Sequence, residues 1–223
     1  MKKLIYILLM SLLALQACTK RSAVSDPSTL TVGTFNIAWL GDAQNDKFDR
    51  TVEHYELIAE FIQRSGADVM GVQEIENGKA LDILLKFLPG WSYKIGSNGG
   101  EQNVGVIYKN GVEIKSLGEY MPVSVVENRT RPGFIVQGKK GNFDWLMMVV
   151  HFKATSRYDD TPEKKLESYR IRSDQAEVVD NWVDSVLAAG SEDDIFLVGD
   201  FNDNPEREKT HTLDSLRSEE RRV

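Results

Sequence analysis

The sequence predicts an α/β (α+β) protein, a four-layer αββα sandwich of two mixed β-sheets flanked by helices. Two observations support this fold class. Short apolar and β-branched runs occur in hairpin pairs, which form antiparallel sheet, and other such runs alternate with stretches of helical periodicity, which is typical of parallel pairing. With 223 residues, of which 41% are hydrophobic, the chain suits one globular domain with a substantial core.

Helical periodicity occurs at three places. Residues 47–65 carry apolar residues at helical spacing, and Gly66 follows as a C-terminal stop. Residues 79–88 form a second predicted helix, and residues 162–187 form a long amphipathic third one. The strands are predicted, in chain order, over residues 30–35, 68–73, 91–95, 103–109, 112–117, 134–137, 145–152 and 194–199.

The first seventeen residues differ from the rest of the chain. Lys2 and Lys3 precede an apolar run over residues 4–15, which is typical of a secretory signal peptide over residues 1–17. Cys18, the only cysteine, then stands where a bacterial lipobox places its lipidated residue, although Gln16 departs from that pattern. We therefore expect an exported lipoprotein of the bacterial cell envelope, held at the membrane through Cys18, with residues 18–29 as lipidated cysteine and tether. Ordinary signal cleavage and a plain membrane anchor are the alternatives.

Net charge limits the mode of nucleic-acid binding. The chain has 27 basic and 34 acidic residues, a net charge of −7, and removal of Lys2 and Lys3 with the leader makes it −9. A binder that relies on phosphate neutralisation by lysine and arginine usually carries a basic face, which is not visible in bulk here. An acidic nuclease remains possible where bound cations supply the local positive field.

Polar oxygen ligands follow three of the predicted strands. Asn36 ends the first, Glu74 ends the second, and the last delivers Asp200 and Asn202 onto a turn. Clustered carboxylate and amide oxygens are ligands for a hard divalent cation, and Mg²⁺ needs only one or two protein carboxylates besides substrate phosphate. Each residue taken alone could equally cap a turn.

Six short motifs in order along the chain resemble the endonuclease/exonuclease/phosphatase superfamily, which includes deoxyribonuclease I. They are residues 34–37 (TFNI), 72–74 (VQE), 103–109 (NVGVIYK), 130–132 (TRP), 150–153 (VHFK) and 199–203 (GDFND). The resemblance implies that Glu74 holds a catalytic Mg²⁺, with Mn²⁺ as the alternative, and that Asn36 supports it. It also implies a water-activating role for Asp200 and a phosphoryl-oxygen contact for Asn202.

The remaining site assignments also follow from this resemblance. It implies that His151 contacts the scissile phosphate and is held by a glutamate, so we expect a contact between Glu101 and His151 that favours the imidazolium. It places Arg131 near the phosphate, with Arg129 as a competitor. Asp200 and Asn202 stand two residues apart, so on an extended segment their side chains would face the same way. The side chain of Asp203 would then point away, and we expect it to cap a turn. The family pattern also includes Arg172 and Gln175, for which a surface-helix position is equally expected.

The family pattern normally closes with a strand-end Ser-Asp-His, and no counterpart follows here. His54 falls in the first predicted helix and His211 lies only nine residues beyond Asn202, so neither matches. We therefore expect the domain, residues 30–223, to lack its final strands, and its activity to suffer.

Three functions are compatible with these observations. The first is a divalent-metal-dependent phosphodiester hydrolase, a nuclease acting on DNA by in-line attack of water. The second keeps the fold but takes a phospholipid head group, an inositol phosphate or a sugar phosphate. The third is an inactive, truncated surface lipoprotein. No obligate protein partner is predicted.

Overall fold

The structure, a computed structural model, describes residues 29–204 and divides them between two β-sheets and flanking helices. The first sheet consists, in spatial order, of β1 (Val32–Leu40), β2 (Val69–Ile75), β4 (Asn103–Lys109) and β3 (Trp91–Ile95). The second consists of β5 (Glu113–Tyr120), β6 (Gly133–Lys140), β7 (Phe143–His151) and β8 (Ile195–Asp200). The helices are α2 (Val52–Arg64), α3 (Gly78–Leu85), the 3₁₀ turn η1 (Met121–Val123) and α4 (Pro162–Ala189).

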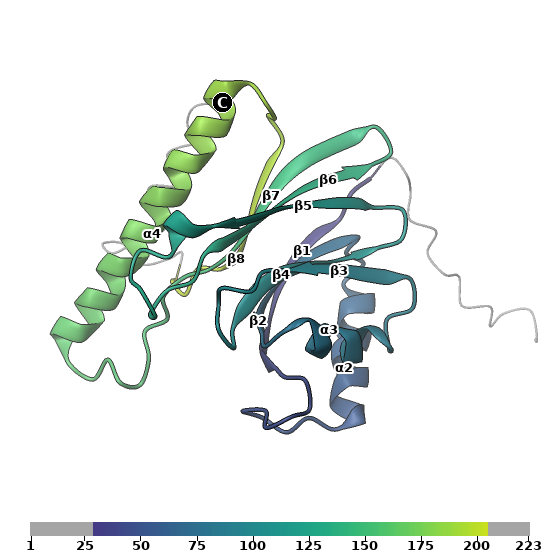
Figure 1. The fold of residues 1–223 in the computed structure, drawn as a ribbon, viewed down its shortest axis with the longest axis horizontal. Coiled ribbons are helices and arrows are strands. Elements are labelled where there is room, and N and C mark those ends of the chain that lie inside the picture. The colour runs from purple at the N-terminus through teal and green to yellow at the C-terminus, as the bar shows by residue number, and fades with distance from the viewer. Residues whose placement is uncertain (1–28, 205–223) are drawn as a thin grey trace, which may run out of the picture.

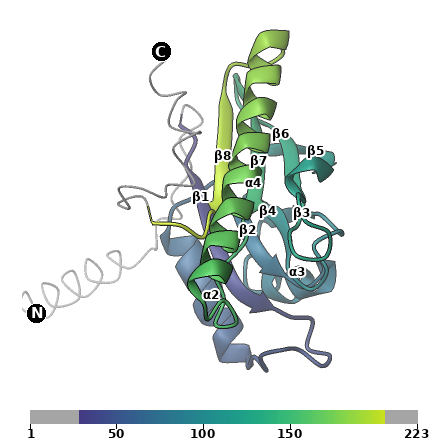
Figure 2. The ribbon, with the colours of Figure 1, turned by 90° about the vertical axis from the view of Figure 1, so that its left-hand side faces the viewer.

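The elements form four layers. Helices α2 and α3 cover the outer face of the first sheet, and α4 runs along the outer face of the second (Figures 1 and 2). Three apolar clusters fill the three spaces between these layers. The middle cluster joins the sheets, with Val104 and Val106 on one side and Trp145 and Met147 on the other. The predicted αββα fold class is therefore confirmed.

Both sheets are mixed, as the alternation of motifs predicted. In the first sheet β1 pairs with β2 in parallel, and Asn36 lies beside Gln73. In the second sheet β7 pairs with β8 in parallel, and His151 lies beside Asp200. The remaining ladders are antiparallel. Since the ends of parallel strands share one edge of a sheet, each sheet presents polar strand ends at one edge.

Close contact between the sheets depends on Gly71 in β2. A Cβ added there would lie 2.7 Å from Cγ2 of Val198 and 3.2 Å from Cγ1 of Val149. Both valines belong to the second sheet, so the missing side chain lets the sheets approach near the strand ends. The position tolerates a hydrogen atom and little else.

The structure differs from prediction at the first strand and the first helix. β1 continues to Leu40, so Asn36, expected to end the first strand, lies inside it. α2 begins only at Val52, behind the N-cap Thr51, and Phe48 precedes the helix. Phe48 and Val52, expected on the buried face, are 51% and 59% exposed.

The expected signal peptide, Cys18 and most of the tether fall outside the described residues, as does His211. Over residues 29–204, none of the helices combines the length and the apolar character that a bilayer crossing requires.

Candidate active site

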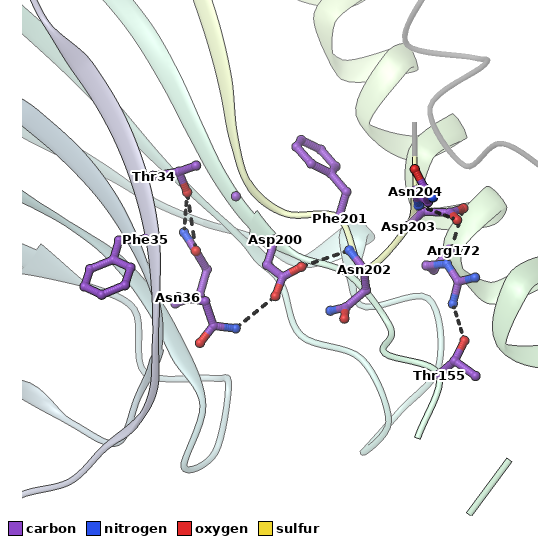
Figure 3. Close-up of a pocket in the computed structure, with 12 residues that line it drawn as sticks. Thr34, Phe35, Asn36, Thr155, Arg172, Asp200, Phe201, Asn202, Asp203 and Asn204 are labelled. Atoms are coloured by element: carbon purple, nitrogen blue, oxygen red, sulfur yellow. Dashed lines mark hydrogen bonds and ion pairs between the residues drawn. The ribbon is translucent and has the colours of Figure 1, made fainter. Parts of the chain in front are cut away.

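Polar strand ends from both sheets meet at one place. Asn36 comes from β1, Glu74 from β2, His151 from β7 and Asp200 from β8. The side-chain amide nitrogen Nδ2 of Asn36 donates to Oε1 of Glu74 at 3.0 Å and to Oδ2 of Asp200 at 2.9 Å. One NH₂ group therefore joins carboxylates that belong to different sheets, and Figure 3 shows its bond to Asp200.

The backbone at this place is strained. Four non-glycine residues here have left-handed backbone angles: φ is 61° at Glu74, 53° at Asn202, 51° at Ala38 and 60° at Trp39. This region costs a residue with a Cβ about 1–3 kcal/mol and persists only where the surroundings impose it. Such residues concentrate at functional sites, which agrees with the position of these four.

The segment after β8 forms a turn and is not extended as expected. The backbone N–H of Asn202 donates to Oδ1 of Asp200 at 2.9 Å (Figure 3). Nδ2 of Asn202 donates to the carbonyl of Phe152 at 3.0 Å. The first bond closes an Asx turn, and the second ties that turn to the end of β7. Asp200 and Asn202 thus come together through a turn and not through strand alternation.

His151 is buried and electrically neutral. Its side chain is 4% exposed, and burial together with the positive charge of Arg131 lowers its pKa to about 3, against the opposing effect of Asp200. Nε2 lies 3.8 Å from Oε1 of Glu74, too far for a hydrogen bond, and Nδ1 has no hydrogen-bond partner among residues 29–204. The expectation of an imidazolium is therefore wrong for this structure. The neutral ring can donate one hydrogen bond and accept one.

The expected contact between Glu101 and His151 is absent. Glu101 is exposed and lines a small separate pocket beside Trp39 and Lys47. Its neighbour Gln102 turns to the site instead, where its Oε1 accepts a hydrogen bond from Nη2 of Arg131 at 2.7 Å. The carboxylates near His151 are Glu74, 3.8 Å from Nε2, and Asp200, its neighbour in the ladder between β7 and β8.

Arg131, and not its competitor Arg129, faces the site. Burial lowers the pKa of Arg131, while the negative charges of Glu74 and Asp200 act in the opposite direction, so both carboxylates favour the charged guanidinium. Arg129 is exposed and forms a surface ion pair with Glu167 at 2.5 Å. The structure thus resolves the alternative that the sequence left open.

The strand ends border a cleft of about 680 Å³. Asn36, Asp200 and Asn202 line it, and Arg172 and Thr155 close its far side (Figure 3). Arg172, a candidate for a surface position, is only 2% exposed and pairs with Asp203 at 3.7 Å. Asp203, for which a turn-capping role was expected, instead takes part in an ion pair that sequence reasoning missed. The charged residue at an apolar helical position was the available signal.

The donor set suits a divalent cation. Glu74 and Asp200 present two carboxylate oxygens around one Asn36 amide, and rotation of that amide by 180° would present its oxygen to the same point. Hard oxygen ligands of this kind are those that Mg²⁺ and Mn²⁺ prefer.

A second acidic group lies where the loop after β1 meets the end of β2. Ligand oxygens of Asp42, Asp46 and Glu76 lie within 4.8 Å of one another, so they could also approach a cation. However, these carboxylates accept backbone N–H bonds from Asp42, Ala43 and Gln44, which order the loop without an ion.

Comparisons with known proteins agree with this geometry. The fold is similar to that of a mannosyl-6-phosphatase from Bacteroides thetaiotaomicron, with a TM-score of 0.59, 17% identity, and coverage of 86% of this chain and 71% of that one. It is also similar to the human Nocturnin catalytic domain with bound sulfate, with a TM-score of 0.58, 18% identity, and coverage of 84% of this chain and 70% of that one. A third similar structure is D. rerio TDP2 complexed with a single-strand DNA product, with a TM-score of 0.57, 16% identity, and coverage of 79% of this chain and 62% of that one. No curated protein matches the chain. The sequence profile of the Endonuclease/Exonuclease/phosphatase family matches residues 33–220. The chain therefore belongs to this family, whose members are phosphoesterases and nucleases, most of them metal-dependent.

Proposed function

We propose that this protein is a divalent-metal-dependent phosphodiester hydrolase, a nuclease that uses Mg²⁺ or Mn²⁺. The observation that carries the proposal is the Asn36 amide, which Glu74 and Asp200 share; Asn36 and Asp200 line the cleft. Two carboxylates that converge from different sheets, beside a buried arginine and a neutral histidine, form a site for a cation and a phosphate together.

Each residue has a role in hydrolysis by water. A metal ion held by Glu74, Asp200 and Asn36 would offset charge on the phosphoryl oxygens. Arg131 contacts the same oxygens through its planar guanidinium, and neutral His151 donates a hydrogen bond to one of them. Asp200 orients the attacking water and accepts its proton as the new P–O bond forms and the bond to the leaving oxygen breaks.

A small phosphate ester is the second candidate substrate, and the distribution of charge favours it. Net charge is −7, and the cation among the described residues that line the cleft, Arg172, already pairs with Asp203. A long polyanion gains little from such a surface. Sugar phosphates, inositol phosphates and phospholipid head groups need only the local site, and one structure with this fold is that of a sugar phosphatase.

The test is hydrolysis by the full chain in Mg²⁺ and in Mn²⁺. The substrates are plasmid and oligonucleotide DNA, RNA, mannose 6-phosphate, an inositol phosphate and sphingomyelin vesicles. Glu74→Gln should lose activity about 10²–10³-fold, whereas Glu56→Gln, the same change on the exposed face of α2, should not. Cleavage of nucleic acid supports the nuclease, and cleavage of small esters alone supports the second candidate. No turnover of any substrate would leave the inactive scaffold.

We also propose that the protein is exported and anchored in the bacterial envelope through Cys18. The leader composition supports this proposal. A Cys18→Ser variant expressed in bacteria should move from the membrane fraction to the soluble envelope fraction. Equal membrane retention of both forms would contradict lipidation.

A further inference from the structure

One face of α4 is polar although it is buried. Ser168, Arg172 and Gln175 are 0%, 2% and 0% exposed. Their spacing of four and three residues places them on one side of the helix. Further along the helix the buried positions are apolar, with Ala176, Val179 and Trp182 in the cluster against the second sheet.

Arg172 joins two segments that carry site residues. Its Nη1 donates to the carbonyl of Lys153 at 3.1 Å and to Oγ1 of Thr155 at 3.0 Å, and its Nε lies 3.7 Å from Oδ2 of Asp203. Lys153 follows His151 by two residues, and Asp203 follows Asn202 directly. Figure 3 shows Arg172 between Thr155 and Asp203. One guanidinium therefore sets the spacing between the end of β7 and the turn after β8.

Gln175 joins the same segment to a third. Its Oε1 accepts the backbone N–H of Lys153 at 2.8 Å, and its Nε2 donates to the carbonyl of Val123 at 3.1 Å. Val123 opens the loop that ends at Arg131, and this loop is closed on itself by a 2.9 Å bond from Oγ of Ser124 to the carbonyl of Thr130. Through Gln175 and this loop, the position of Arg131 also depends on α4.

We propose that Arg172 and Gln175 are positioning residues that hold His151, the turn with Asp200 and Asn202, and the Arg131 loop in one register. Neither side chain needs to touch substrate for this. Each of these buried side chains hydrogen-bonds to defined partners. A substituted side chain without the same donors and acceptors would leave those partners unsatisfied in the interior. The turnover readout of the proposal rests on the proposed function, whereas its structural readout does not.

The structural readout is amide hydrogen exchange of the full chain. In Arg172→Met and in Gln175→Leu, exchange should accelerate at Phe152, Lys153 and Asn202, because their N–H bonds belong to the joined segments. Arg170→Met removes an exposed guanidinium from the same helix and should leave these amides unchanged. Acceleration confined to Arg172→Met and Gln175→Leu supports the proposal. Identical exchange in Arg172→Met and Arg170→Met overturns it.

The second readout is kinetic and uses whichever substrate the wild type hydrolyses. Arg172→Met should lower kcat about 100-fold with little change in KM, because the reacting groups are displaced while the cleft remains. Arg172→Lys, which keeps the charge beside Asp203, should recover part of the loss. An unchanged kcat in Arg172→Met overturns the proposal.

The proposal can still be tested if Arg172→Met does not fold or if the wild type shows no activity. If Arg172→Met fails to fold, Thr155→Val is the substitute variant, because it removes just one hydrogen bond of Arg172. Faster amide exchange at Lys153 together with a reduced kcat would support the proposal. No change in either quantity would overturn it. If the wild type hydrolyses nothing, the proposed function fails. The exchange comparison then still decides whether these two residues hold the three segments together.

Discussion

Replacing Lys140 with methionine should destabilise the fold by about 3 kcal/mol without touching the active site. Nζ of Lys140 in β6 donates to Oδ2 of Asp68 at 2.8 Å, and the two side chains are 7% and 5% exposed. Asp68 also accepts the backbone N–H of Thr31 at 3.0 Å, just before β1. The pair thus joins the two sheets at the starts of β1 and β2, away from the strand ends that form the site.

The magnitude follows from what remains after the ammonium is removed. Breaking a buried ion pair leaves an uncompensated charge and costs about 3–5 kcal/mol. Asp68 keeps its Thr31 bond, and Nζ of Lys109 lies 3.8 Å from Oδ1, so the lower end applies. At about 2–4 °C per kcal/mol for a protein of this size, Tm should fall by about 6–12 °C.

The pH dependence has a defined sign. Burial raises the pKa of Asp68, but the hydrogen bonds from Lys140 and Thr31 and the charges of Lys140 and Lys109 outweigh it, so the folded pKa lies below the usual value. A depressed acidic pKa stabilises the fold above the unfolded pKa of about 3.9, and this stabilisation is lost as pH falls through the folded pKa. The difference between wild type and Lys140→Met should therefore be full at pH 7 and shrink below about pH 4.

Urea unfolding measures this difference. Lys139→Met is the matched control, because it makes the same change at the neighbouring, exposed position. It should shift the free energy of unfolding by no more than about 0.5 kcal/mol. Equal stabilities of the two variants, or a difference that grows at acid pH, would refute the argument.

Two further predictions concern packing and helix capping. Gly71→Ala should lower the free energy of unfolding in urea by about 1–3 kcal/mol, because the added Cβ would meet Val198 in the opposite sheet. In the control Gly33→Ala the nearest atom is the flexible end of Met70, so the loss should be smaller. The reverse order of the two losses would contradict the inter-sheet packing. Thr161→Ala should cost about 1 kcal/mol by the same measurement, since Thr161 Oγ1 accepts the Lys164 N–H at the start of α4, and Thr161→Ser should restore most of it.

Local patterns predicted the elements well because their causes are local. Strand alternation, helical spacing and Gly66, which has a φ of 73°, depend on neighbouring residues. Each predicted strand and helix is present, two strands (91–95 and 103–109) with the predicted ends and the others with shifted ends. α2 starts later than predicted because Thr51 caps it, so the apolar Phe48 could not be told from a helical residue by spacing alone.

The site was less accessible to sequence reasoning because its contacts are distant in the chain. Asn36 and Asp200 stand 164 residues apart. The pattern of polar residues after predicted strands offered them as ligands of one site, and the family resemblance supplied their separate roles. The left-handed φ of Asn202 and the burial of Arg172 depend on segments packed against them. The only local signal was the place of Arg172, a charged residue at an apolar helical position. Glu101 was expected at the site because of the family resemblance, whereas the loop geometry turns its neighbour Gln102 toward Arg131.

Calorimetric titration with Mg²⁺ and Mn²⁺ tests the central claim most directly, namely that Asn36, Glu74 and Asp200 form one cation site. The account predicts binding by the wild type, weakened about 10-fold or more in Asp200→Asn and in Glu74→Gln. Glu76→Gln, which alters the other acidic group, should bind like the wild type. Full affinity in Asp200→Asn, or loss of binding in Glu76→Gln alone, would contradict it.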